Sequence, residues 1–314
     1  MSRQDITQQL INTVDELSDP KALQGLFHEH YDGDPLPSGK ELEEIIELSR
    51  AVLFPGFYGN SFVNIQTTKY QIGVNVERLH KLLTRQVLAG LCFNEDCHCA
   101  HIEDIRKCMR EEAEMIAQRV IAKFPAIRQM LSTDVQAAFE GDPAAKNEGE
   151  VISCYPVIKA LTNYRIAHEL YLEDVPLIPR MMTELAHSET GIDIHPRATI
   201  GTHFTIDHGT GVVVGATCVI GNHVKLYQGV TLGAKSFPLD KDGKPIKGIA
   251  RHPILKDGVV VYANATILGR ITIGEDCVVG ANVWVTHDME PRTKKYRQNK
   301  EDRLDVRFDE GEGI

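Results

Sequence analysis

The chain has 314 residues, enough for two domains, and its 44 acidic and 34 basic residues give a formal net charge of −10. An acidic chain lacks the basic face needed to bind a phosphate backbone, which argues against a general nucleic-acid binder. No apolar run is long enough to span a bilayer, and the acidic N-terminus lacks the apolar core of a signal peptide, so we expect a cytoplasmic protein without membrane contact. Its seven cysteines form no paired framework, which indicates reduced thiols.

The first 190 residues are typical of helices. Ser38 precedes a stretch with carboxylates in its first turn, a pattern that predicts a helix N-cap. Apolar residues recur at helical spacing in further stretches, namely 75–91, 102–124, 151–172 and 175–189. We therefore predict a helical N-terminal domain over residues 1–190, interrupted by a polar segment around Asp142-Pro143.

A six-residue period follows over residues 192–285. This period fits neither a 3.6-residue helix nor a long ordinary strand, but it fits a parallel β-solenoid whose coils stack to bury an aliphatic stripe. Glycines near the expected corners would adopt a positive φ at little cost. The aliphatic positions are Ile194, Ile200, Ile206, Val214, Ile220, Leu226, Leu232, Val261, Ile267, Ile273, Val279 and Val285.

The period is lost once, between Leu232 and Val261. Residues 234–250 are rich in Lys, Gly, Asp and Pro, which predicts a loop extruded from the solenoid, on the face where repeat proteins often bind ligands. Residues 291–314 are charged and without apolar pattern, so we expect a flexible tail. The predicted fold class is α+β: helices over 1–190, a parallel β-helix over 191–290, and the tail.

One solenoid turn carries the pair Asp207-His208. Most single histidines lie on the surface without a role, and we assign His203, His223 and His287 to that group. His208 differs because it follows a carboxylate, lies in a Gly-rich turn and has Asp193 fifteen residues earlier, close to one coil of about eighteen residues. An aspartate that accepts from one imidazole nitrogen would leave the other nitrogen as a base.

Several motifs together resemble one enzyme family. The run of residues 191–234, which contains Asp-Ile-His-Pro and Asp-His-x-Thr-Gly, is similar to hexapeptide-repeat acetyltransferases, and specifically to serine O-acetyltransferases. Three other elements match the same family in the same order: Asp-Pro-Ala-Ala at Asp142, residues 163–171, and Arg251-His252-Pro253. The resemblance covers about residues 140–290 and the C-terminal end.

The resemblance implies a left-handed parallel β-helix that assembles as a trimer or as a dimer of trimers. It implies transfer of acetyl from acetyl-CoA to the hydroxyl of L-serine, the first step toward cysteine. His208 would be the general base and Asp193 would orient it. The implied serine-binding residues are Asp142, Asp207, Arg251 and His252. The resemblance places acetyl-CoA in a groove between subunits, where the implied contacts are Gly233, Ala234, Ala263 and Ala281. Lys235 and Lys247 are candidates for binding the phosphates of CoA.

The tail carries a second resemblance. The ending Gly-Glu-Gly-Ile314 is similar to the C-terminus by which this enzyme docks into O-acetylserine sulfhydrylase. The family also implies L-cysteine as a feedback inhibitor in the serine pocket. The chain departs from the common form in its longer loop over 234–250, and in Tyr262, Ala216 and Lys146, which replace a glycine and two acidic residues.

Alternatives remain open. Cys92, Cys97, His98, Cys99 and His101 have metal-ligand types, but their spacing matches no standard finger, and we expect thiols and no metal. Cys218 stands at a solenoid position without an adjacent base, which favours packing over an acyl-cysteine route. The solenoid could instead serve another hydroxyl acceptor, such as a sugar, or act as a non-catalytic scaffold for the sulfhydrylase.

Overall fold

The computed structural model describes residues 3–28, 35–59, 64–93, 102–236 and 238–296. The chain divides into two compact units, residues 1–35 and residues 36–314. The first unit contains α1 (Arg3–Leu17), whose side chains from Ile6 to Leu17 along its apolar stripe are exposed. The second unit contains the other helices and all strands, so it holds every predicted site residue that is described.

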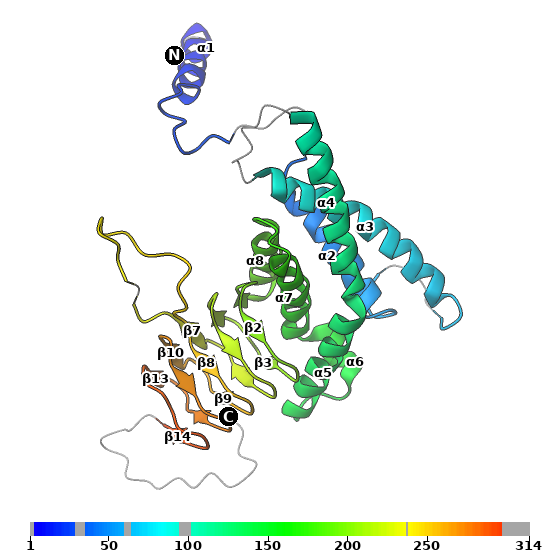
Figure 1. Cartoon of the computed structure of the whole chain (residues 1–314), viewed down its shortest axis with the longest axis vertical. Coiled ribbons are helices and arrows are strands. Elements are labelled where there is room, and N and C mark those ends of the chain that lie inside the picture. The colour runs from blue at the N-terminus through cyan, green and yellow to red at the C-terminus, as the bar shows by residue number, and fades with distance from the viewer. Residues whose placement is uncertain (1–2, 29–34, 60–63, 94–101, 237, 297–314) are drawn as a thin grey trace. The chain divides into compact units, whose positions relative to one another are not determined.

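The helices of the second unit begin and end at recognisable signals (Figure 1). The Ser38 side chain accepts from the backbone N–H of Glu41 and caps α2, as predicted, and Asn147 caps α6 in the same way. Gly191 ends α8 in the left-handed conformation. The bounds are α2 Gly39–Leu53, α3 Thr68–Phe93, α4 Ile102–Ala122, α5 Phe124–Gly141, α6 Glu148–Cys154, α7 Pro156–Leu172 and α8 Ile178–Thr190.

A solenoid of short parallel strands follows α8, which confirms the predicted fold class. Up to β13, strands of one sheet recur every third strand: the first sheet is β1-β4-β7-β10-β13, the second β2-β5-β8-β11 and the third β3-β6-β9-β12, to which β14 is added. Their bounds are β1 Asp193–Ile194, β2 Thr199–Ile200, β3 Thr205–Asp207, β4 Val213–Val214, β5 Val219–Ile220, β6 Lys225–Tyr227, β7 Thr231–Gly233, β8 Ile254–Leu255, β9 Val260–Val261, β10 Thr266–Leu268, β11 Thr272–Ile273, β12 Val278–Val279, β13 Trp284–Val285 and β14 Lys294–Lys295.

The aliphatic positions that defined the six-residue period all point into the coil. Each of them is at most 7% exposed. The strands pair in the same register, so that Ile194, Val214, Leu232, Ile267 and Val285 form one continuous buried row. Leu255, which lies six residues before Val261 and was not among the predicted positions, is 1% exposed and continues the row of the second sheet.

The explanation expected for the corner glycines is wrong at several positions. Gly215 and Gly221 do not have a positive φ. They are required by crowding: a Cβ on Gly215 would lie 2.0 Å from Cδ2 of His252, and a Cβ on Gly221 would lie 2.1 Å from Oδ1 of Asp257. The left-handed corners are instead taken largely by polar residues such as His208 (φ 56°) and Asn264 (φ 58°).

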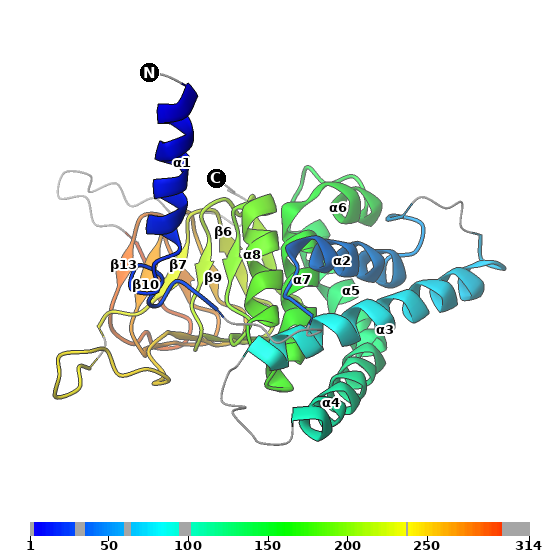
Figure 2. The ribbon, with the colours of Figure 1, turned by 90° about the horizontal axis from the view of Figure 1, so that it is seen from above.

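Helices α5, α7 and α8 cover the first coil of the solenoid, and the later coils stack away from them (Figure 2). The segment 163–171 of α7 contributes hydrogen bonds to this contact. Tyr164 donates to the carbonyl of Ala198 at 2.6 Å, and His168 Nδ1 lies 2.7 Å from the carbonyl of Pro196. The segment that matched the family by sequence therefore joins the helices to the solenoid.

The loop between β7 and β8 projects from the solenoid in both views (Figures 1 and 2). Its residues from Leu239 to Ala250 are exposed, and Asp240 organises it by accepting from the backbone of Asp242 and Lys244. Among the helices that the structure describes, none is both long enough and apolar enough to cross a membrane.

Candidate functional site

The predicted serine-binding residues lie at two different corners of the solenoid. Asp207 ends β3 of the third sheet, and His208 begins the turn that leads to β4 of the first sheet. Arg251 and His252 precede β8 of the second sheet and contact Thr217, which lies between β4 and β5. We call these places the His208 corner and the His252 corner; the first sheet lies between them.

Asp142 reaches the His208 corner from the C-terminal end of α5. One of its oxygens accepts from the backbone N–H of Ala144 at 2.8 Å, and the other accepts a short hydrogen bond from the hydroxyl of Tyr155. The bond from Tyr155 is the main reason why the pKa of Asp142 lies below its usual value. The same bond raises the pKa of Tyr155 to about 12. Asp142 is therefore an oriented anion at neutral pH.

The His208 side chain is exposed and is not hydrogen-bonded to Asp207. Its side chain is 72% exposed, and its Nε2 lies 3.8 Å from Oδ1 of Asp207, which is too far for a hydrogen bond. The other oxygen of Asp207 lies 3.2 Å from Nζ of Lys225. The corner thus combines an accessible imidazole with two carboxylates that have fixed partners.

His252 is buried and held in one protonation state. Its Nδ1 accepts from the backbone N–H of Thr217 at 3.1 Å, and Thr217 Oγ lies 2.8 Å from the same nitrogen. Because Nδ1 accepts, the proton of the neutral ring is on Nε2, which is left to donate. Burial, followed by the charge of Arg251, lowers the pKa of His252 to about 4. A neutral N–H donor beside a guanidinium suits a carboxylate ligand.

Arg270 fixes the turn that carries these two residues. Its Nη1 donates to the carbonyl of Thr217 at 2.6 Å and to the carbonyl of His252 at 3.0 Å. A cleft of about 450 Å³ opens at this corner, and Arg197, Lys247 and Arg251 are among its lining residues. The His252 corner is consequently rich in basic side chains.

The low pKa of His252 predicts a loss of stability in mild acid. The folded protein holds this proton more weakly than the unfolded chain, whose pKa is near 6.5. The contribution of neutral His252 to the free energy of unfolding is therefore fully present above about pH 6.5, and it is lost as the pH falls toward 4. Urea unfolding at about pH 7.5 and about pH 5 should show that wild type loses about 1–2 kcal/mol more than His252→Gln over this interval. Equal losses in both proteins would contradict the assignment.

Asp193 was expected to orient His208. In the part of the chain that the structure describes, its Oδ1 accepts from Nη1 of Arg180 at 3.0 Å, and no hydrogen bond joins it to His208. Asp193 also forms a group with Glu184 and His187 whose potential ligand atoms lie within 4.8 Å of one another. Arg180 pairs with both carboxylates of that group, so a cation is already present there.

The predicted acetyl-CoA residues also divide between the corners. Ala263 and Ala281 lie in the same column of the solenoid as His208, just after strands that pair in register. Successive coils place His208, Gln228, Ala263 and Ala281 in this column. Gly233 ends β7 at the other side of the first sheet, and Ala234 follows it. Small residues along a column allow a thin ligand to approach the backbone.

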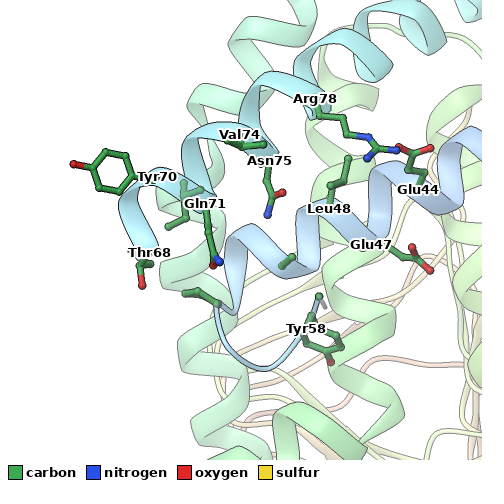
Figure 3. A pocket seen from close by; sticks show the side chains of 14 residues that line it. Glu44, Glu47, Leu48, Tyr58, Thr68, Tyr70, Gln71, Val74, Asn75 and Arg78 are labelled. Atoms are coloured by element: carbon green, nitrogen blue, oxygen red, sulfur yellow. The ribbon is translucent and has the colours of Figure 1, made fainter. Parts of the chain in front are cut away.

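Other candidates of the sequence are less informative. Cys97, His98, Cys99, His101 and the C-terminal Ile314 lie outside the described residues. Cys218 is 1% exposed and its burial raises the pKa of its thiol to about 12, which agrees with a packing role. A pocket of about 530 Å³ between α2 and α3 is lined by residues such as Glu44, Tyr58 and Arg78 (Figure 3), and it contains none of the predicted site residues.

Comparison with known proteins identifies the class first. Residues 252–287 match the family described as "Bacterial transferase hexapeptide (six repeats)", so the solenoid is that of the hexapeptide-repeat transferases. A serine acetyltransferase of Synechococcus elongatus is 47% identical over 255 residues, which are 81% of this chain and 80% of the relative. That of Bacillus subtilis is 44% identical over 161 residues, 51% of this chain and 70% of the relative. The chain belongs to the serine acetyltransferase family, which confirms the resemblance found in the sequence.

Solved structures agree with this membership. Serine acetyltransferase 1 of Entamoeba histolytica, in complex with L-cysteine, superposes with a TM-score of 0.68 at 35% identity, covering 81% of this chain and 86% of that one. The enzyme of Neisseria gonorrhoeae in complex with serine gives a TM-score of 0.51 at 26% identity, covering 81% and 93%. Both support the combination of helices and solenoid described above.

Proposed function

We propose that this chain transfers acetyl from acetyl-CoA to the hydroxyl of L-serine, giving O-acetyl-L-serine and CoA. The observation that carries the proposal is the pair of corners: carboxylates beside an exposed imidazole at one, and a guanidinium beside a neutral N–H donor at the other. These match the α-ammonium and the α-carboxylate of an amino acid. The serine bound in the Neisseria relative is consistent with this ligand.

In the proposed reaction His208 is the base. It removes the proton of the serine hydroxyl as the oxygen attacks the thioester carbonyl; the tetrahedral intermediate then collapses, the C–S bond breaks, and the thiolate of CoA takes up the proton. Asp142 and Asp207 hold the ammonium, while Arg251 and His252 hold the carboxylate. Ala263 and Ala281 continue the column below His208, and with Gly233 and Ala234 they are the proposed contacts of acetyl-CoA.

We further propose that the site is completed between copies of the chain in a trimer. The His208 corner and the His252 corner lie at opposite edges of the first sheet, which separates them within a single chain. A three-fold rotation would bring the His208 corner of one chain to the His252 corner of the next, as cyclic assemblies allow. Asp193, which lies on the first sheet, is then proposed to orient the His208 of a neighbouring chain.

Two regulatory contacts are part of the proposal. L-cysteine would compete in the serine site, because it carries the same ammonium and carboxylate; the cysteine complex of the Entamoeba relative is consistent with this. Ile314 would dock the tail into O-acetylserine sulfhydrylase, since a terminal carboxylate and one apolar side chain fit a small pocket.

An acceptor panel tests the function. CoA release from acetyl-CoA should depend on L-serine, should fall at least about 100-fold in kcat/KM with L-serine methyl ester, which lacks the carboxylate, and should be absent with a neutral sugar. Faster release with the sugar would replace serine by a sugar hydroxyl as the acceptor. Absence of release with every acceptor, from a folded protein, would leave the scaffold alternative.

A further inference from the structure

Lys225 contacts Asp207 and the backbone carbonyl that directly precedes Asp142 at the His208 corner. It lies on β6, and its side chain is 17% exposed. Its Nζ donates to the carbonyl of Gly141 at 2.7 Å and lies 3.2 Å from Oδ2 of Asp207. Gly141 is the last residue of α5 and directly precedes Asp142. One ammonium group thus ties the chain segment that carries Asp142 to the strand that carries Asp207.

The position of this ammonium is itself fixed. Nζ lies 4.5 Å from the centre of the Tyr227 ring, within the range of a cation–π contact. The Tyr227 ring stacks on that of Tyr262, with centres 4.9 Å apart and planes 8° from parallel. Tyr262, which stands where the family usually has glycine, therefore supports the ring on which Lys225 rests.

The charges at the corner explain why an ammonium is useful there. Asp142 and Asp207 together carry two negative charges, and Lys225 cancels one of them. What remains is one negative charge for the single positive charge of the serine α-ammonium. Burial acts to lower the pKa of Lys225, but its contacts with Tyr227 and Asp207 outweigh this and raise the pKa, so the group is charged at neutral pH.

We infer that Lys225 is a positioning residue for the amino-acid substrate: it holds Asp142 and Asp207 at a fixed separation and leaves them one net charge with which to bind the α-ammonium. The inference rests on the proposed function, because it assumes that these carboxylates bind serine. Lys225 does not act on the reacting atoms; it acts through its two neighbours.

The test compares Lys225→Met and Lys225→Arg with wild type and with Lys256→Met, a matched control at an exposed lysine directly after β8. KM for serine should rise about 10- to 100-fold in Lys225→Met, with kcat and KM for acetyl-CoA changed less than about 3-fold, because Asp142 and Asp207 lose the group that holds them in position. Lys225→Arg should keep KM for serine closer to wild type because it keeps the charge. Lys256→Met should match wild type.

The pH profile separates this role from a merely structural one. The charge of Lys225 helps to lower the pKa of Asp142, so the acidic limb of kcat/KM for serine should move up in Lys225→Met and stay in place in Lys225→Arg. The titratable groups at this corner are Asp142, Tyr155, Asp207, His208, Tyr227 and Tyr262. An unchanged KM and acidic limb in Lys225→Met, or an equal shift in both variants, would overturn the inference. Wild type without serine-dependent CoA release would overturn the proposed function, and the inference with it.

Discussion

Replacing His208 by alanine should lower serine-dependent CoA release by about 10²–10⁴-fold, which is what a positioned general base contributes. The imidazole is 72% exposed and is not hydrogen-bonded to Asp207, so its loss removes the base without removing a structural contact. The variant should therefore assemble and unfold like wild type. Stopped-time measurements of free thiol, with L-serine and acetyl-CoA saturating, give the comparison.

His223→Ala provides the matched control. His223 also occupies a left-handed solenoid corner, with φ of 55° against 56° for His208, but its ring stacks on His203 away from the proposed site. It should retain the activity of wild type. Activity of His208→Ala within a factor of ten of wild type would mean that another group removes the proton.

The second large effect concerns stability. Asp134 is fully buried in α5; both of its oxygens accept from Arg165 of α7, at 2.8 and 2.9 Å, and the backbone N–H of Phe204 donates to one of them at 3.1 Å. Asp134→Ala leaves the guanidinium buried without its partner. The free energy of unfolding should fall by about 3–5 kcal/mol, measured by urea unfolding at equal protein concentration.

An exposed ion pair serves as the comparison for this prediction. Lys81 and Glu77 pair at the surface of α3, with side chains 72% and 70% exposed. Lys81→Ala should leave the urea midpoint almost unchanged, because exposed pairs contribute little. Equal midpoints for Asp134→Ala and wild type would contradict the predicted contribution of the buried pair to stability.

The six-residue period predicted most of the solenoid because each coil repeats the same inward position. It missed Leu255, because the loop after β7 interrupts the six-residue period, so counting forward from the earlier coils does not reach this position. Leu255 is nevertheless six residues before Val261, so extending the period backwards from the second half would have found it. The corner glycines were misjudged because period alone does not distinguish a positive φ from a close contact such as that between Gly215 and His252.

The sequence named the candidate site residues, but it did not predict which of them contact one another. Sequence order gives no sign that Asp193 pairs with Arg180, or that Thr217 holds His252, since these contacts join different coils and helices. Lys225 and Tyr155 were missed because lysine in a strand and tyrosine before a helix are ordinary surface features. Asp134 left a detectable signal: it lies on the apolar face of α5, between Leu131 and Val135.

The measurement that tests the split site most directly mixes two inactive variants. His208→Ala and Arg251→Ala chains, co-expressed or refolded together, should recover about one quarter of wild-type serine-dependent CoA release, because about one quarter of the interfaces in random trimers pair two intact corners. Each variant alone should stay inactive. Activity of the mixture no higher than that of the separate variants, with mixed trimers verified by mass, would contradict a site built from neighbouring chains.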